Sequence, residues 1–266
     1  MRASFRSGPW RATATCARAT RPSLPGASEP PVTSIPPILL AATGLRREAR
    51  IVSGPGVLTV SGGGDATRLE AELERLAPQV RGILSTGLAG ALAPGLEPGD
   101  WVVAGAVLDG HSRIPTHPEW TEWLLHYLPG AMPGLVAGSE EMVTGARWKA
   151  QLRKASGAVA VDMESHIAGR VAQRHGLPFA VARAISDSAK RNLPPAAMLG
   201  MRPDGRMAPL AVLGSVLRDP LQIPALLRTG IEAEKAFRAL LRGNRRLGAG
   251  LGAPAVLGAL RTADLH

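Results

Sequence analysis

Two short segments of the sequence place a carboxylate directly after an apolar run. Glu164 lies in VDMES at residues 161–165, and Asp187 ends RAISD at residues 183–187. A carboxylate accepts two hydrogen bonds at once, so Glu164 can hold the two neighbouring hydroxyl groups of a sugar. A shielded aspartic acid can hold a proton near neutral pH, so Asp187 can deliver one to a leaving group. Both acids could instead cap helices, because acidic side chains stabilise the first turn.

Glycine-rich segments follow two further apolar runs. In TGLAG at residues 86–90, backbone amides beside small residues can approach a sugar or a phosphate closely, so Gly87, Ala89 and Gly90 are candidate substrate contacts. In SGGGD at residues 61–65, a helix N-terminus could cradle an anion. This second segment lacks the lysine of a phosphate-binding loop and fails the dinucleotide fingerprint, so we exclude nucleoside triphosphates. A plain tight turn is the alternative for both segments.

The other residues that could carry chemistry give no metal or thiol signal. The six histidines lack the ligand spacing of a His-Glu-x-x-His motif, so we predict no metal and no cofactor. Cys16 is the single cysteine, which rules out an internal disulfide and fits a reducing cytosol. Glu48 follows two arginines, and its local sequence alone indicates a solvent-exposed, salt-bridged helix face.

Alternating strands and helices are predicted to position these residues. Apolar runs bounded by Gly and Pro indicate strands, and leucines at helical spacing indicate helices. The predicted strands cover residues 38–43, 56–60, 82–86, 100–108, 135–137, 158–161 and 179–185. The predicted helices cover residues 45–52, the segment after a capping Asp65, then 119–127, 146–155, 162–175 and, with breaks near Pro220 and Pro224, 207–241.

This alternation predicts an α/β fold, a single domain with a central mixed, largely parallel sheet flanked by helices. Ligands in such sheets bind beyond the carboxyl ends of the strands, where the acids and glycines described above fall. We assign residues 37–243 to this domain. Residues 1–36 are predicted to be a disordered basic extension, and residues 244–266 a flexible tail.

The net charge of +10 does not indicate nucleic-acid binding, because the two predicted tails carry most of it. The longest apolar run of the predicted domain, residues 207–217, is shorter than the about 20 residues that a membrane-spanning helix needs. We therefore expect a cytoplasmic protein without a nucleic-acid partner. Basic tails can attract anionic lipid, so peripheral association with the inner face of the membrane stays open.

Taken together, the motifs resemble the purine nucleoside and uridine phosphorylase superfamily. They are STGLAG at residues 85–90 with a following Gly-Asp pair at 99–100, then VDMES, then RAISD, and the similarity extends over about residues 38–241. Within this superfamily the sequence most resembles the hopanoid-associated phosphorylases. That likeness rests on VDMESH at residues 161–166 and on the apolar segment between residues 209 and 228.

The resemblance implies cleavage of the N-glycosidic bond of a nucleoside. Glu164 would bind the ribose hydroxyls, and Met163 would pack under the sugar. Asp187 would protonate the purine at N7, positioned by Ser186.

Three further residues receive roles from the resemblance. Met142 and Val143 fall where related nucleosidases hold the purine base. Glu48 falls where the adenine nucleosidases keep the carboxylate that orients the attacking water, in contrast to the exposed position that its local sequence indicates.

The sequence departs from the family at the phosphate site. Family phosphorylases bind phosphate partly with an Arg and a Ser, and this chain has Ser85 and Leu88 at those positions. Glu48 would also repel phosphate, so we favour hydrolysis over phosphorolysis. If phosphate is a co-substrate after all, Thr86 is a candidate contact, and Arg68, Arg46 or Arg47 could supply the positive charge.

Several substrates fit this resemblance. The hopanoid-associated branch implies adenosylhopane, a lipid-linked nucleoside that would lose adenine. The alternatives are a soluble 5′-methylthioadenosine/S-adenosylhomocysteine nucleosidase, a general purine nucleoside phosphorylase and, in another class, a non-catalytic nucleoside-binding module. Relatives are oligomers, so we expect a homo-oligomer.

Overall fold

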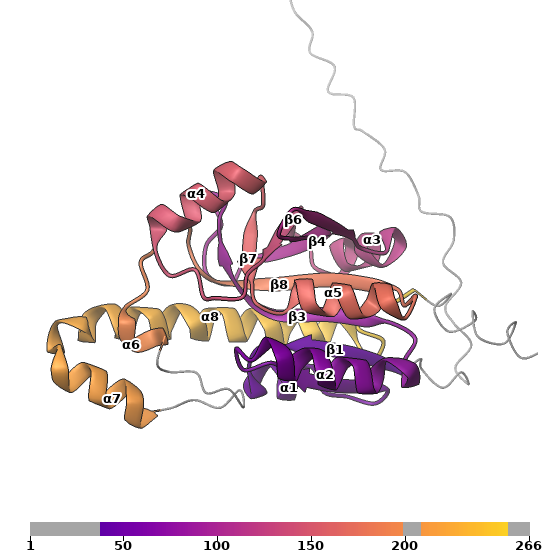
Figure 1. The fold of residues 1–266 in the computed structure, drawn as a ribbon, viewed down its shortest axis with the longest axis horizontal. Helices are drawn as coiled ribbons and strands as arrows, with labels where there is room; N and C mark the ends of the chain where they lie inside the picture. The colour runs from indigo at the N-terminus through magenta and orange to yellow at the C-terminus, as the bar shows by residue number, and fades with distance from the viewer. Residues whose placement is uncertain (1–37, 199–208, 255–266) are drawn as a thin grey trace, which may run out of the picture. The chain divides into compact units, whose positions relative to one another are not determined.

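The protein is built around one mixed eight-stranded sheet, seen in a computed structural model that describes residues 38–198 and 209–254 (Figure 1). Most of the sheet follows the order β2-β1-β3-β7-β6-β4-β5, and β8 pairs with both β3 and β4. The strands are β1 Leu39–Thr43, β2 Val57–Ser61, β3 Ile83–Ala91, β4 Trp101–Asp109, β5 Ser112–Pro115, β6 Met132–Gly138, β7 Ala160–Asp162 and β8 Phe179–Asp187.

Parallel and antiparallel pairs are combined in this sheet. Strand β1 pairs in parallel with β2 and β3, β3 with β8, and β6 with β4 and β7. The antiparallel pairs join β3 with β7 and β4 with β5 and β8. The predicted α/β fold with a mixed, largely parallel sheet is confirmed.

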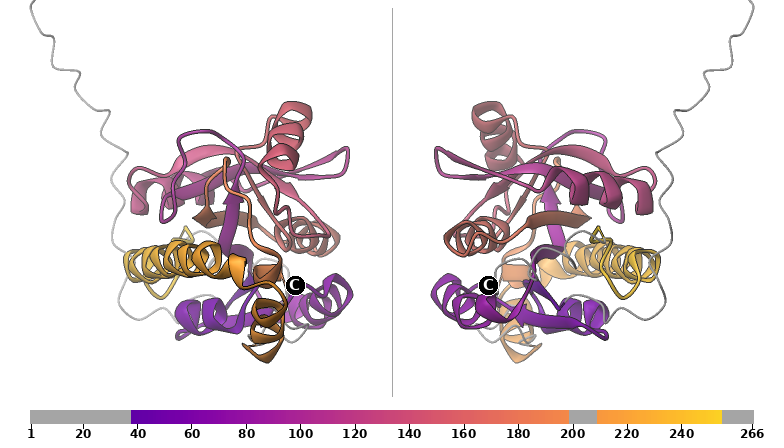
Figure 2. Two further views of the ribbon diagram at one scale, coloured as in Figure 1. Left: turned by 90° about the vertical axis from the view of Figure 1, so that its left-hand side faces the viewer. Right: turned by 90° about the vertical axis from the view of Figure 1, so that its right-hand side faces the viewer.

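Helices cover both faces of the sheet. Helices α2 and α5 pack on one hydrophobic cluster, and α1, α3 and α8 pack on another, both rich in Ala, Val and Leu. In the views of Figures 1 and 2, the long α8 runs beside β3 and β8, which it contacts. The helices are α1 Arg46–Val52, α2 Ala66–Leu76, α3 Pro118–Tyr127, α4 Ala146–Ser156, α5 Ser165–Arg174, α6 Pro195–Met198, α7 Pro209–Arg218 and α8 Ile223–Leu247.

Two helix starts follow from their sequences. Asp65 caps α2 as predicted, because its Oδ1 accepts a hydrogen bond from the backbone amide of Arg68 at 2.9 Å. Pro224 lies in the first turn of α8, where a missing amide hydrogen costs nothing. The predicted break therefore falls between Arg218 and Ile223, where a short 3-10 turn joins α7 to α8.

The predicted end of β3 at Thr86 is wrong. The strand continues to Ala91 because β8 pairs with it in parallel through Gly90, and β7 pairs with its last two residues. The glycine-rich segment thus lies within a strand rather than in a turn. Gly87 has a φ of +139°, a conformation that residues with a Cβ rarely adopt.

Two other boundaries differ from the predictions. Residues 112–115 belong to none of the predicted strands or helices but form β5, an edge strand paired with the end of β4. Helix α8 continues past residue 243 to Leu247, and Leu251 is then buried in the cluster that contains Trp120. The predicted N-terminal extension lies outside the described residues. Within the described ranges, no helix is long and apolar enough to cross a membrane.

Candidate active site

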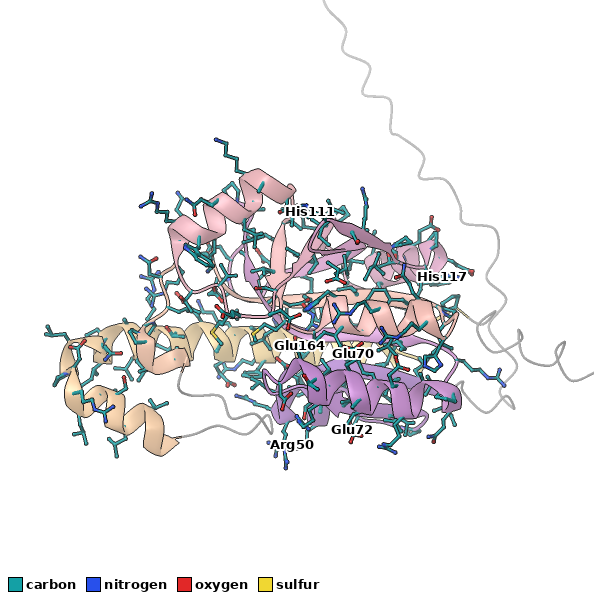
Figure 3. The ribbon with its side chains drawn as sticks, viewed as in Figure 1. Arg50, Glu70, Glu72, His111, His117 and Glu164 are labelled. Carbon is teal, nitrogen blue, oxygen red and sulfur yellow. The ribbon has the colours of Figure 1, made fainter. Side chains whose placement is uncertain are left out.

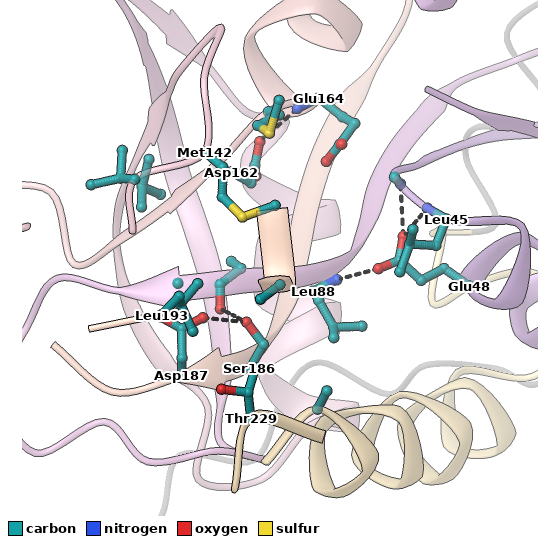
Figure 4. Close-up of a pocket in the computed structure, with 18 of the residues that line it drawn as sticks. Leu45, Glu48, Leu88, Met142, Asp162, Glu164, Ser186, Asp187, Leu193 and Thr229 are labelled. Carbon is teal, nitrogen blue, oxygen red and sulfur yellow. Dashed lines mark hydrogen bonds between the residues drawn. The ribbon is translucent and has the colours of Figure 1, made fainter. Parts of the chain in front are cut away.

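A cavity of about 240 Å³ opens where β1, β3, β7 and β8 end or bend (Figure 4). It brings together most of the residues that the sequence singled out. The predicted site residues that line it are Glu48, Ala89, Gly90, Met142, Val143, Met163, Glu164, Ser186 and Asp187. Figure 4 shows Glu48 and Glu164 on one side of the cavity, which we call the sugar end, and Asp187 on the other, which we call the base end.

Glu48 is held at the sugar end by three backbone amides. Its Oε2 accepts hydrogen bonds from Gly44 at 2.7 Å and Leu45 at 2.8 Å, and its Oε1 accepts one from Leu88 at 3.1 Å. The side chain is 2% exposed, so the exposed helix face indicated by its local sequence is wrong. Burial raises the pKa of Glu48, while the Leu45 amide and the charge of Arg183 oppose the rise.

Two glycines make room for the acids of the sugar end. A Cβ at Gly87 would lie 2.7 Å from Oε2 of Glu48, and a Cβ at Gly44 would lie 2.8 Å from Oε1 of Glu164. Both distances are too short for real side chains. Gly87 does not line the cavity, so its place as a direct substrate contact stays a prediction, and its visible role is to admit Glu48.

Arg183 is the cation of the sugar end, and it is completely buried. Its Nε lies 2.9 Å from Oδ2 of Asp162, and its Nη1 lies 3.2 Å from Oε2 of Glu164. Its Nη2 donates to Oγ of Ser85 at 2.6 Å. This arginine belongs to the RAISD motif, but no role was predicted for it. An arginine inside an otherwise apolar strand was the available signal, because a buried cation needs partners.

Glu164 is the N-cap residue of α5 and is buried, whereas Arg50 on α1 is exposed; Figure 3 labels both. Burial raises the pKa of Glu164 to about 8, Arg183 lowers it, and the charges of Asp162 and Glu48 raise it. Asp162 also caps α5, because its Oδ1 accepts from the amides of Glu164 and Ser165 at 3.0 and 2.7 Å. One guanidinium therefore faces several carboxylates, and Glu164 retains a proton near neutral pH.

Asp187 lies at the base end and is 5% exposed. Ser186 donates from its Oγ to Oδ1 of Asp187 at 2.6 Å (Figure 4). On the other side, the ammonium group of Lys149 donates to Oδ2. Lys149 was not predicted as a site residue, because it lies on a helix with three other basic residues, a pattern typical of a solvent-exposed face. The available signal was its spacing, because it lies three residues before the partly buried Leu152.

The remaining predicted residues divide between the cavity and its surroundings. Met142 and Val143 lie in the connection between β6 and α4 and give the cavity an apolar wall. Thr86 is buried and does not line the cavity. Arg68 does not line it either, since its Nη2 donates to the carbonyl groups of Ser61 and Gly62.

The charges around the cavity are unequal in sign. Its described lining residues include five acids but neither Lys nor Arg. The acids are Glu48, Glu141, Asp162, Glu164 and Asp187. Within the same described ranges, no group of His, Cys, Asp or Glu side chains is arranged to hold a metal ion. The cavity thus favours a neutral ligand that donates hydrogen bonds over a free anion.

Known structures share this fold. The 5′-methylthioadenosine/S-adenosylhomocysteine nucleosidase of Helicobacter pylori is 17% identical over 80% of this chain and 97% of its own, with a TM-score of 0.56. The S-adenosylhomocysteine nucleosidase of Streptococcus pyogenes is 18% identical over 82% and 100%, with a TM-score of 0.55. A futalosine hydrolase mutant of Helicobacter pylori is 18% identical over 58% and 89%, with a TM-score of 0.51.

A family profile gives a more specific result than these structural likenesses. The profile described as the phosphorylase superfamily matches residues 51–198, which include β3, the apolar wall and both acidic motifs. The matched segment is more than half of the chain. The chain therefore belongs to the phosphorylase superfamily, and it is an enzyme of the class that cleaves N-glycosyl bonds.

Proposed function

We propose that this enzyme cleaves the N-glycosidic bond of an adenosyl substrate with water and releases adenine. The observation that carries the proposal is one cavity with Asp187 at one end and Glu48 and Glu164 at the other. A purine nucleoside presents a proton-accepting base and a hydroxyl-bearing sugar, and the two ends offer a matching group to each.

Bond cleavage follows from these groups. As the bond between C1′ and N9 stretches, the sugar becomes oxocarbenium-like and negative charge moves into the purine. A proton delivered by Asp187 to N7 neutralises that charge, and Ser186 holds the carboxyl group in place. General acid catalysis of this kind contributes about 10²- to 10⁴-fold.

Glu164 is the group proposed to bind the ribose. Its buried carboxyl accepts hydrogen bonds from the two hydroxyl groups best when ionised, and Met163 beside it adds an apolar surface for the ring. Because the pKa of Glu164 is raised to about 8, the bound hydroxyls would displace its proton at neutral pH.

Charge supports water rather than phosphate as the second substrate. Phosphate is an anion, and no lysine or arginine is among the described residues that line the cavity. Arg183 is engaged by Asp162, Glu164 and Ser85. Glu48 keeps free acceptor capacity on Oε1, which takes only the Leu88 amide, so it can orient a water molecule and accept its proton.

The apolar surroundings of the cavity favour adenosylhopane among adenosyl substrates. Four further residues of the cavity wall come from α8 and from α6 and the segment before it, and all but one of them are apolar: Leu193, Ala197, Thr229 and Ala233. The adjoining α7, 3-10 turn and α8 expose large apolar side chains beside arginines, as at an anionic lipid surface. The exposed apolar side chains are Leu213, Leu217, Leu221, Ile223, Leu227 and Ile231. This surface supports action in the cytoplasm at the inner face of the membrane.

A soluble nucleoside is the second candidate substrate. The solved structures of similar fold include nucleosidases named for 5′-methylthioadenosine and S-adenosylhomocysteine, whose 5′ groups are small. In that case the exposed apolar surface of α7, the 3-10 turn and α8 would be buried against a second copy of the chain in a homo-oligomer. A general purine nucleoside phosphorylase is less consistent with the acidic cavity, and a non-catalytic binding module would not need both acidic ends.

The test is release of free adenine from adenosylhopane and, separately, from 5′-methylthioadenosine, each with and without phosphate. The proposal predicts release from adenosylhopane at a rate that phosphate does not change. Release from 5′-methylthioadenosine alone would move the enzyme to the soluble nucleosidases. Strict dependence on phosphate would overturn the choice of water, and no release from either compound would favour a binding module.

A further inference from the structure

Lys149 is a completely buried lysine in direct contact with the proposed acid. Its Nζ reaches three acceptors, which are Oδ2 of Asp187, the carbonyl of Ser188 at 3.0 Å and the carbonyl of Arg191 at 3.4 Å. A neutral amine has two N–H bonds, whereas an ammonium group has three. The three acceptors therefore match the charged, proton-carrying form of Lys149.

The hydrogen bonds of Asp187 match an ionised carboxylate. Ser186 has one hydroxyl proton, and Oδ1 of Asp187 at 2.6 Å is the nearer of its two acceptors, since the carbonyl of Ala89 lies at 3.2 Å. Lys149 donates to Oδ2, so both oxygen atoms of Asp187 act as acceptors. A carboxylate in this state has no proton to give. Asp187 can therefore act as a general acid only if a neighbouring group supplies it with a proton. The ammonium group of Lys149 contacts Asp187 and has a proton that it can transfer.

We propose that Lys149 is a positioning residue that supplies the proton which Asp187 delivers to the leaving base. This inference rests on the proposed function. One N–H proton of Lys149 passes to Asp187, and Asp187 gives a proton to N7 while the electron pair of the C1′–N9 bond moves into the purine. Lys149 is left as a neutral amine and Asp187 as a carboxylate. Water adds to C1′ and loses its proton to Glu48. Exchange with solvent then removes this proton from Glu48 and returns one to Lys149, so both groups regain their starting states.

The other charged side chains near Lys149 and Asp187 bind other partners or lie in other parts of the cavity. The side chain of Arg191 lies 3.2 Å from Glu232 and donates to the carbonyl of Ala225 at 3.1 Å. On the same helix as Lys149, Arg153 donates to the carbonyl of Ala158. Glu141 is exposed at the cavity wall, and Glu48 and Glu164 lie at the sugar end.

A purely structural role is the competing explanation, because Lys149 also ties the Ser188–Arg191 segment to α4. The two explanations differ in what a small amine can repair. Replacing Lys149 by alanine leaves a space beside the substrate cavity that an alkylammonium ion can enter. Such an ion can return a proton to Asp187, but it cannot rebuild the link between the two segments.

The test therefore measures adenine release by Lys149→Ala and Lys149→Met with adenosylhopane and 5′-methylthioadenosine. We expect kcat to fall by at least about 100-fold while KM changes little, and the loss to grow from pH 6 to pH 9, because Asp187 must then take its proton from solvent. Ethylammonium should restore part of the activity of Lys149→Ala in a saturable way. Lys154→Ala, an exposed position on the same helix, should match the unaltered protein.

A second substrate separates proton supply from folding. The leaving group of 4-nitrophenyl β-D-ribofuranoside departs without a proton, so Lys149→Met should hydrolyse it as fast as the unaltered protein does. Equal losses on this substrate and on the nucleosides, or no rescue by ethylammonium, would overturn the proposal for Lys149 and leave the proposed function intact. An unaltered protein that releases no adenine from any nucleoside would contradict both.

Discussion

The two ends of the cavity combine the same kinds of charge in different proportions. At the sugar end, the single guanidinium of Arg183 faces Asp162 and Glu164 directly, with Glu48 close enough to influence it. At the base end, one ammonium group from Lys149 meets one carboxylate from Asp187. The first cluster has more acids than cations, and the second is balanced.

This difference gives the two ends different chemistry. Burial, with a smaller contribution from the charges of Asp162 and Glu48, raises the pKa of Glu164 to about 8 although Arg183 opposes the rise. The sugar end is therefore a hydrogen-bonding site whose charge changes near neutral pH. The base end holds a buried ion pair with one transferable proton. Binding should depend on the first cluster and the chemical step on the second.

The largest effect on the chemical step is expected from Asp187→Asn. The amide cannot transfer a proton to N7, so kcat for adenine release should fall by about 10²- to 10⁴-fold. KM should change by less than a few fold, because the sugar end is untouched. Steady-state assays of adenine release measure both constants. An unchanged kcat would show that Asp187 is not the general acid. The proposed division between a binding end and a chemical end of the cavity would then be wrong.

The largest effect on folding is expected from Arg183→Met. Loss of the guanidinium leaves buried carboxylates without their cation, which typically costs about 3–5 kcal/mol. Urea denaturation should show this loss, whereas Arg238→Met, at a largely exposed position on α8, should change stability by less than about 0.5 kcal/mol. A similarly small cost at Arg183 would mean that the sugar-end cluster does not act as a unit.

A smaller and more selective effect is expected from Glu164→Ala. Removing the acceptor for the ribose hydroxyls should weaken nucleoside binding by about 10- to 100-fold, since hydrogen bonds to a charged group contribute about 1.5–3 kcal/mol. Calorimetric titration of 5′-methylthioadenosine into an Asp187→Asn background measures binding without turnover. Glu119→Ala, at an exposed position in the first turn of α3 that does not line the cavity, is the control and should bind normally. Equal affinity in both variants would contradict the assignment of the sugar end.

The smallest expected effect is a change of affinity with pH. Ribose hydroxyls donate to Glu164, so binding favours its ionised form and releases a proton below pH 8. Affinity in the Asp187→Asn background should therefore rise by up to about 10-fold per unit as the pH approaches 8, and level off above it. The added change Glu164→Gln should flatten this profile. An affinity that falls with rising pH would show that the protonated form binds instead.

Much of the fold could be predicted because local patterns determine it. The buried strands β1 and β8 are apolar runs, and α2 shows a capping Asp65 followed by leucines at helical spacing. The extent of β3 could not be predicted in this way, because glycine weakens a strand locally and the pairing with β8 is tertiary.

The site was predictable where a motif carried it and not where burial depends on distant partners. The motifs VDMES and RAISD predicted Glu164 and Asp187 as site residues, and both line the cavity. Arg183 and Lys149 were missed because the acids that pair with them, Asp162 and Glu164 for the first and Asp187 for the second, are distant along the chain. For Glu48 the family resemblance indicated a site residue, whereas its local sequence indicated an exposed one. The local sequence failed because one of the three amides that hold the buried carboxylate, that of Leu88, comes from the distant strand β3.

The most direct test of the central proposal is to run the reaction with adenosylhopane in water enriched in oxygen-18, with and without phosphate. Mass spectrometry of the sugar product then reports which atom has replaced adenine at C1′. The structure predicts free adenine and one oxygen-18 atom at C1′, at a rate that phosphate does not change. A C1′ phosphate without oxygen-18 would contradict hydrolysis, and the absence of free adenine would contradict the proposed function itself.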